Sequence, residues 1–434
     1  RYEVVVESDE GWHFAGATFP GVPFPALGHN EHLGWTFTVN RPDLVDVYQL
    51  EMNEAGDQYM LDGEWRDLEE KTVTLPVKLG PIVLPIRQTV HRSAHGPVIK
   101  NDKGAFAIRY AGIDNIGSLD AFYRKTKATT FDEWRAVMAR RDIPSFNAVY
   151  ADKTGNIAYY YNAALPDRKP GPNWRGILPG NDSTLIWAGP VEYDRVPQVV
   201  NPASGWLYNS NNTPFTAAGA GSDLAPDDYA PELGVELKQT NRSLRAYKLM
   251  SEANLLDRAN LKRIKYDMVY ERESYVDDLF NAAKDLEVDG ELAEARDLLL
   301  GWDFTADNEG AGDAIALLMI RDFMSAEYGN RPYPDVEEKL REASDHLITL
   351  FGNLVPPMSD LLRLRQGDVD LALDGGSDTL RASTTWQVDD DGRLQLVHGD
   401  SFIQWVEWNE GEPVSSRSIQ PFGAATTRPD SPHH

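Results

Sequence analysis

The sequence has 434 residues, no cysteine and a formal net charge of −26, from 68 acidic and 42 basic side chains. This length allows a large buried core, and the excess of negative charge argues against nucleic acid or an anionic membrane as a partner. The lack of cysteine excludes thiol catalysis, thiolate metal sites and disulfides, and it is compatible with a periplasmic or secreted enzyme. No stretch reaches the roughly 20 consecutive apolar residues that a membrane helix needs.

The most informative stretch is residues 23–48, PFPALGHNEHLGWTFTVNRPDLVDVY. Within residues 33–39 apolar side chains alternate with small or polar ones, which predicts a strand with one apolar face. Pro42 follows and ends the strand, because proline has no amide hydrogen. A strand that ends in a sharp turn can leave a backbone N–H unpaired and available to an acceptor, such as a developing oxyanion.

Short strands with turn signals continue to residue 99. The sequence then predicts a helix over residues 122–141, with Thr130 as the N-cap of FDEWRAVMARR. Residues 143–162 contain two strand-like runs separated by DKTGN at 152–156, which is typical of a β-hairpin turn.

The later part of the chain has a helical pattern, because residues 232–327 carry apolar side chains at a spacing of three to four between charges. The tail returns to strands, and the DDDG sequence at 389–392 predicts a hairpin turn. No internal repeat or linker divides the chain. We therefore expect one interwoven domain over residues 1–434, with a helical section at about residues 232–365.

Three local patterns resemble a known family. The GHN at residues 28–30, the W-x-x-T that starts at Trp35 and the D-x-x-D from Asp43 to Asp46 are similar to the catalytic chain of the penicillin amidase family. The similarity recurs in blocks along nearly the whole chain. This family of N-terminal nucleophile hydrolases includes penicillin, cephalosporin and acyl-homoserine-lactone acylases. The resemblance implies an α+β fold, a four-layer αββα sandwich with a helical insertion, and removal of an acyl group from an acyl-homoserine lactone or a penicillin-like amide.

In the family, a serine freed by autoproteolysis is the nucleophile, and its own α-amine is the base. Because this sequence begins with Arg1, the resemblance implies that the serine lies a few tens of residues upstream, and that a signal peptide and a smaller α chain come from the same precursor. The oxyanion is expected to bind the backbone N–H of Val39 and the side-chain amide of Asn211. Asparagine suits that role because it is neutral and offers a fixed N–H dipole.

The resemblance also assigns supporting residues. Arg242 matches an arginine that supports the site from the start of a helix, with Arg245 as the alternative register and a purely structural arginine as the other interpretation. Leu27, Phe37 and Phe146 fall at positions that line the acyl pocket, so we expect aliphatic or aromatic acyl groups to be preferred. For Phe146 an ordinary core phenylalanine is an equal alternative.

A calcium site is predicted from the carboxylates of Asp43 and Asp46 and the carbonyl of Val45, with Asp223 as a distant ligand. Hard oxygen donors converge on this loop, and some family members bind calcium here. The alternative is a capped turn without metal. No organic cofactor is expected.

Other residues with chemical potential are assigned structural roles. His29 and Asn30 are expected to be a buried, hydrogen-bonded pair, and His91 and His95 lie on a strand pattern that does not suit a helical metal pair. Two other functions are alternatives. One is a catalytically inactive binding or structural member of the same fold. The other, a Ser-His-Asp hydrolase, is disfavoured because the sequence has no G-x-S-x-G.

Overall fold

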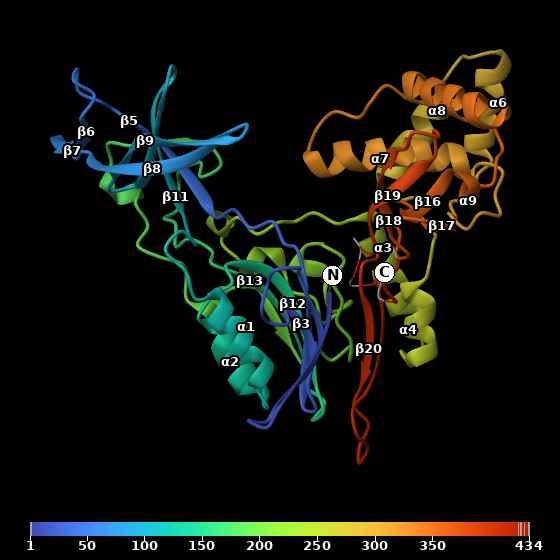
Figure 1. The fold of residues 1–434 in the computed structure, drawn as a ribbon, viewed down its shortest axis with the longest axis horizontal. Helices are drawn as coiled ribbons and strands as arrows, with labels where there is room; N and C mark the ends of the chain where they lie inside the picture. The colour runs from blue at the N-terminus through green and yellow to red at the C-terminus, as the bar shows by residue number, and fades with distance from the viewer. Residues whose placement is uncertain (1, 424, 426–427, 429, 433–434) are drawn as a thin grey trace.

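The computed structural model describes residues 2–423, 425, 428 and 430–432. Figure 1 shows two regions: strands from the first half of the chain lie on the left and in the centre, and a helical region with the C-terminal strands lies on the right. The segment between β15 (Gln198–Val200) and α3 (Asn241–Glu252) connects them. Among the described residues no helix is both long enough and apolar enough to span a membrane.

The central feature of the first region is an antiparallel 7-stranded sheet. In spatial order its strands are β1 (Tyr2–Ser8), β2 (Trp12–Thr18), β3 (Leu27–His29), β4 (Leu33–Thr38), β12 (Ser145–Asp152), β13 (Ile157–Ala163) and β15. Helices α1 (Ser118–Lys127) and α2 (Phe131–Ala139) cover one face (Figure 1), where Trp134 of α2 packs against Trp35 and Tyr150. This aromatic core holds β4 in a fixed position, and with it the residues that directly follow the strand.

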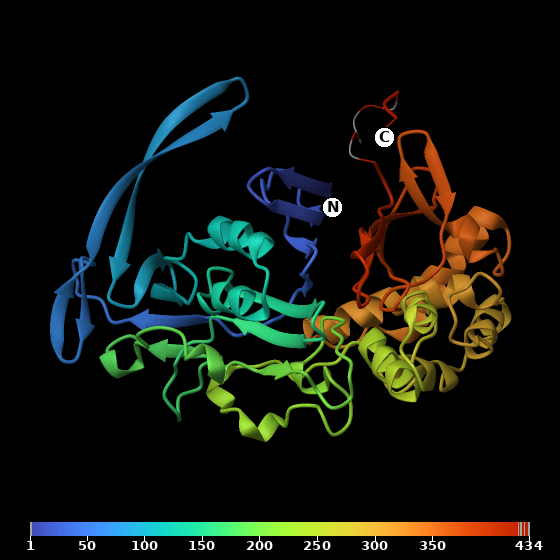
Figure 2. The same ribbon diagram turned by 90° about the horizontal axis from the view of Figure 1, so that it is seen from below.

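A 6-stranded sheet lies beside the first one. In spatial order its strands are β14 (Ile177–Pro179), β5 (Val45–Leu50), β11 (Gly104–Tyr110), β10 (Gly96–Asn101), β9 (Ile82–Ser93) and β8 (Glu69–Leu79). The outer strands β8 and β9 form a long hairpin that projects from the molecule, as the light-blue arch in Figure 2 shows. A small hairpin, β6 (Gln58–Leu61) with β7 (Glu64–Asp67), adjoins β5 in sequence.

The second region has its own apolar core, formed mainly by helices. Its helices are α3, α4 (Arg258–Lys265), α5 (Tyr275–Lys284), α6 (Gly290–Leu300), α7 (Asp313–Gly329), α8 (Val336–Phe351) and α9 (Met358–Leu361). Its strands are β16 (Leu362–Gln366), β17 (Val369–Ala372), β18 (Ser383–Val388), β19 (Leu394–Gly399), β20 (Ile403–Glu407) and β21 (Ser415–Ile419). Short 3-10 turns occur at Ser183–Leu185, Tyr193–Arg195, Pro214–Thr216, Pro226–Asp228 and Pro231–Leu233.

Several sequence predictions are confirmed. The fold is α+β, the alternating segment forms β4, and both predicted hairpins exist, as β12 with β13 and β18 with β19. In the first hairpin the Asp152 carboxylate accepts a hydrogen bond from the Thr154 backbone N–H at 2.9 Å, which stabilises the turn.

Two helix boundaries differ from the prediction. The expected helix over residues 122–141 is two helices, because Thr130 is extended at φ −131° and caps α2 by accepting a hydrogen bond from the Glu133 N–H. The helical pattern expected from residue 232 begins only at Asn241. Thr240 caps α3 there with its side chain, and residues 231–233 form a 3-10 turn.

Candidate active site

An asparagine-rich turn brings residue 211 to the end of β4. Asn211 has a positive φ of 60°, a conformation that asparagine tolerates better than most residues. Its backbone N–H donates to the side-chain oxygen of Asn209 at 2.9 Å, and the Ser210 N–H donates to the side-chain oxygen of Asn212 at 2.8 Å. These two bonds within the turn fix the direction in which the Asn211 side chain leaves it.

The Asn211 side chain contacts the predicted oxyanion residue. Its Nδ2 donates to the carbonyl oxygen of Val39 at 2.9 Å. The last registered pair between β4 and β12 joins Thr38 to Asn147, so Val39 lies just past the end of the ladder, where the residue is 60% exposed. Residues that are 172 positions apart in sequence therefore meet at one strand end.

A further asparagine holds this strand end in place. Asn147 is fully buried and its Nδ2 donates to Thr38 Oγ1 at 3.1 Å and to Asn209 Oδ1 at 3.2 Å. The hydroxyl of Tyr159 donates to its Oδ1 at 2.7 Å, so the Asn147 amide is oriented from both ends. The strand end and the asparagine turn are thereby connected through side chains.

Arg242 orients the Asn211 amide. One guanidinium nitrogen, Nη2, donates to Asn211 Oδ1 at 2.7 Å, so the amide oxygen is bound by the arginine and the NH₂ group points to Val39. Arg245, the alternative register, lies in a different network, where it forms ion pairs with Asp267 and Glu271 at 2.8 Å. The structure therefore places Arg242, and not Arg245, against Asn211.

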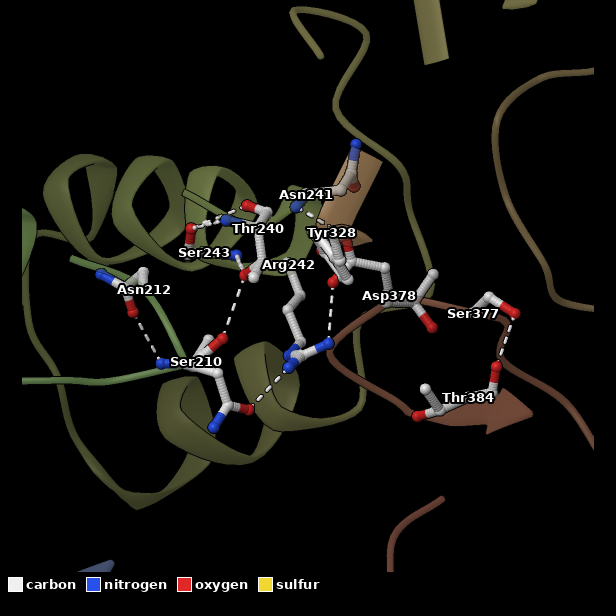
Figure 3. A network of polar contacts seen from close by, with 12 residues as sticks. Ser210, Asn212, Thr240, Asn241, Arg242, Ser243, Tyr328, Ser377, Asp378 and Thr384 are labelled. Atoms are coloured by element: carbon white, nitrogen blue, oxygen red, sulfur yellow. Dashed lines mark hydrogen bonds and ion pairs between the residues drawn. The ribbon is translucent and has the colours of Figure 1, made fainter. Parts of the chain in front are cut away.

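A buried aspartate from a distant loop holds Arg242. Figure 3 shows Arg242 at the start of α3 with its guanidinium directed toward Asp378 and with Tyr328 close by. Arg242 Nη1 lies 2.8 Å from Asp378 Oδ1, and the other carboxylate oxygen accepts from the Asn241 N–H at 2.7 Å and from the Tyr328 hydroxyl. Complete burial raises the pKa of Asp378, and the Arg242 charge opposes this shift.

The predicted acyl-pocket residues are only partly brought together. The rings of Phe37 and Phe146 stack with centroids 5.3 Å apart. Leu27 and Phe37 line a cavity of about 630 Å³ together with Trp206 and Trp408, whereas Phe146 is not part of its wall. Phe37 is thus the residue that joins the cavity to the stacked pair.

Comparison with known proteins identifies the family of the chain. The family model for penicillin amidase matches residues 1–434. The chain belongs to the penicillin amidase family. A solved structure, thermostable penicillin G acylase from Alcaligenes faecalis, aligns with 100% of this chain and 87% of that chain at a TM-score of 0.66 and 18% sequence identity. This likeness shows the fold, that of the N-terminal nucleophile hydrolases.

Curated relatives of the family include two kinds of acylase. Penicillin G acylase from Escherichia coli is 32% identical over 212 residues, which are 47% of this chain and 24% of that protein. Acyl-homoserine lactone acylase PvdQ from Pseudomonas fluorescens (strain Pf0-1) is 24% identical over 463 aligned residues, covering 92% of this chain and 58% of that protein. The chain therefore spans less than two thirds of the length of these relatives.

At the predicted calcium loop of this penicillin amidase family member, an arginine from a distant segment of the chain binds the two aspartates. Arg168, whose side chain is 1% exposed, bonds both oxygens of the fully buried Asp46 through Nε at 3.1 Å and Nη2 at 3.0 Å, and it lies 3.1 Å from Asp43. Trp187 Nε1 also donates to Asp46, at 2.7 Å. The guanidinium thus takes the lone pairs and neutralises the charge that a cation would use.

The other predicted calcium ligands are placed apart or are engaged. Asp223 accepts from the N–H groups of Ala218 and Gly219 at 2.8 and 3.0 Å and from the Tyr247 hydroxyl, so it caps its own turn. Val45 begins β5. Among the described residues no group of three or more His, Asp or Glu side chains is arranged to hold a metal ion. The donors as described do not fit calcium, which stays a prediction that requires Arg168 to be displaced.

Asn30 and His95, which the sequence assigns to structural roles, are both buried in the structure. Asn30 is structural as expected: its oxygen accepts from the Leu33 N–H at 3.0 Å and its nitrogen donates to the Ala128 carbonyl at 2.7 Å. His95 is fully buried, and it lies in the turn between β9 and β10 rather than on a strand. Sequence reasoning missed Asn147, Arg168 and Asp378 as supporting residues, and only the Phe146–Asn147 pair in the strand pattern pointed toward the first of them.

Proposed function

We propose that this chain forms the oxyanion-binding and acyl-binding parts of an amide hydrolase that removes an acyl group from an N-acylated small molecule. The observation that carries the proposal is the orientation of Asn211. Its oxygen is bound by Arg242 at 2.7 Å, and its Nδ2 is 2.9 Å from the Val39 carbonyl oxygen. The names of the relatives supply the two substrate classes, acyl-homoserine lactones and penicillin-like amides.

In the proposed reaction, the serine that the resemblance implies attacks the amide carbonyl carbon. The resulting oxyanion accepts hydrogen bonds from the Val39 backbone N–H and from Asn211. Because an asparagine Nδ2 carries two hydrogens, it can donate one to the Val39 carbonyl and the other to the oxyanion. The α-amine of the serine takes the hydroxyl proton during the attack and gives it to the leaving amine when the tetrahedral intermediate collapses. Water then releases the acid from the acyl-enzyme.

The proposal extends to partners and location. Family membership supports a smaller α chain from the same precursor as the partner of this chain. The absence of cysteine from the sequence is compatible with a periplasmic or secreted protein.

The decisive test compares two substitutions at Asn211 in the protein expressed from its complete reading frame. Asn211→Ala removes the donor, and Asn211→Asp keeps the contact with Arg242 but replaces the NH₂ group with an oxygen. Both should lower kcat by about 10²- to 10³-fold, the usual cost of one oxyanion donor, without unfolding the protein. Asn181→Ala, at an exposed position, is the matched control.

A result with full activity in either Asn211 variant would remove Asn211 from the oxyanion site. A wild-type protein that hydrolyses neither acyl-homoserine lactones nor penicillin-like amides would remove the proposed activity itself.

A further inference from the structure

Lys125 of α1 is a buried amine without a partner. The residue is 0% exposed, and its Nζ has no hydrogen-bond partner among the described residues. Burial lowers the pKa of the Lys125 amine well below its ordinary value, and no carboxylate opposes that shift. Lysine is among the residues that are almost never fully buried without a partner, so this environment needs a reason.

A second lysine of α1 shows that a lysine on this helix can reach water, so the position on α1 does not by itself explain why the Lys125 amine is buried. Lys127, two positions along, extends its Nζ to the Tyr123 hydroxyl at 3.2 Å and its side chain is 32% exposed. Lysine side chains usually reach water in this way, with the stem along apolar surface and the charge outside. Lys125 instead points into the layer between α1 and the 7-stranded sheet.

The surroundings of the Lys125 amine are aromatic. Its Nζ lies 4.2 Å from the centroid of the Phe37 ring, 4.6 Å from that of Phe122 and 5.2 Å from that of Trp35. Phe37 also stacks on Phe146 and lines the cavity described above. The amine therefore lies directly behind Phe37, the residue of the predicted acyl pocket that lines this cavity, although Lys125 itself is not part of the cavity wall.

We propose that Lys125 is a specificity-determining residue, whose amine binds a carboxylate carried at the far end of the acyl group. This inference rests on the proposed function, since the acyl group is what places the carboxylate among these rings. A carboxylate fits better than a neutral oxygen because it supplies both the missing acceptor and the opposite charge. The aromatic faces then stabilise the ammonium form as cation–π partners.

The binding step has a defined proton balance. Burial lowers the pKa of the Lys125 amine and an adjacent carboxylate raises it again, so we expect the amine to take up a proton from the solvent as the carboxylate enters, and the product is an ammonium–carboxylate pair among the rings. No bond other than this N–H bond is formed. Binding of adipate should therefore be coupled to proton uptake, whereas binding of hexanamide, which has the same length and no carboxylate, should not.

The first experiment compares hexanoyl and adipoyl amides of the same amine in the wild type, Lys125→Met and Lys127→Met. Methionine keeps the length and volume of the buried stem and removes the amine. The ratio of kcat/KM for adipoyl over hexanoyl should fall about 10- to 100-fold in Lys125→Met, the range expected when one charge-assisted hydrogen bond is lost. The change should appear in KM, and Lys127→Met should keep the wild-type ratio.

The second experiment measures binding of adipate and hexanamide by calorimetry in buffers of different ionisation enthalpy. If the wild type takes up about one proton with adipate and Lys125→Met takes up none, Lys125 is supported as the carboxylate-binding residue. This holds even if no amide is hydrolysed, because that result would count only against the proposed hydrolase activity. Equal adipate binding in the two proteins, or no adipate binding to the wild type, would overturn the assignment of Lys125. The proposal would also be overturned by an adipoyl-to-hexanoyl ratio of kcat/KM that does not change in Lys125→Met, or by a preference of the wild type for acyl groups that end in a keto or hydroxyl group over those that end in a carboxylate.

Discussion

The substitution Arg168→Met removes the guanidinium that neutralises a fully buried carboxylate. The side chains of Arg168 and Asp46 are 1% and 0% exposed, so water cannot solvate the charge that remains when its partner is removed. Asp43 is 25% exposed and can be solvated, which makes Asp46 the main source of the cost. Removing one partner of such a pair destabilises a protein by about 3–5 kcal/mol, and we expect a loss of this size in the free energy of unfolding.

The assay is urea unfolding of the wild type, Arg168→Met, Asp46→Asn and the double variant. Asp46→Asn keeps an oxygen for the Trp187 indole N–H, so the double variant has neither a buried charge nor an unpaired indole. It should be more stable than Arg168→Met alone. The interaction energy of the cycle measures the coupling between the two side chains.

Chelation and addition of calcium distinguish two sources of the positive charge near Asp43 and Asp46, which are the Arg168 guanidinium and a bound calcium ion. If the guanidinium supplies the positive charge, a chelator leaves the unfolding curve of the wild type unchanged, and added calcium raises the stability of Arg168→Met because oxygens of Asp43 and Asp46 become available. The reasoning is refuted if chelation destabilises the wild type and elemental analysis finds bound calcium. It is also refuted if Arg168→Met unfolds at the wild-type urea concentration.

Three further predictions concern Arg242, Phe146 and His95. Arg242→Met should lower kcat about tenfold or more because the Asn211 amide loses its orienting partner. Adding Asp378→Asn to this variant removes the unpaired buried charge, so it should recover stability but not kcat. If both stability and kcat recovered, the role of Arg242 would be purely structural. Phe146→Ala should shift the kcat/KM profile toward longer or bulkier acyl groups, and an unchanged profile across chain lengths would place the pocket elsewhere. Burial and Arg109 lower the pKa of His95 to about 4 from 6.5, so the unfolded state binds the extra proton and stability should fall as pH drops from 6.5 toward 4. Between pH 7 and pH 4.5 this loss is about 2 kcal/mol. Urea unfolding of His95→Phe at these two pH values should lack this loss. An equal loss in the variant would show that other groups cause the pH dependence.

Local elements were predictable because their signals are local. The alternation in residues 33–38 and the turn residues at 152–156 specify β4 and the β12–β13 hairpin without help from the rest of the chain. The same local reasoning failed at Thr130. Apolar spacing continues across that residue, but its side chain competes for the backbone N–H of Glu133 and starts a new helix.

The counter-charges of the site were not predictable in this way. A pair of aspartates three residues apart indicates a need for positive charge, but local sequence does not distinguish a bound cation from an arginine far along the chain. Arg168 lies 122 positions from Asp46, and Asp378 lies 136 positions from Arg242. The family resemblance supplied Val39, Asn211 and Arg242, whereas their partners became visible only in three dimensions.

The support of Arg242 implies that the helical region takes part in the proposed catalysis. The carboxylate of Asp378 is held by the Tyr328 hydroxyl from α7, and it fixes the arginine that orients Asn211 at the end of β4. Interactions from α7 therefore reach the oxyanion site through one aspartate and one arginine. A substitution such as Tyr328→Phe, which touches neither Asn211 nor Val39, should lower kcat without changing acyl preference, because it loosens orientation while leaving the pocket intact. A changed acyl preference in Tyr328→Phe would show instead that α7 shapes the pocket.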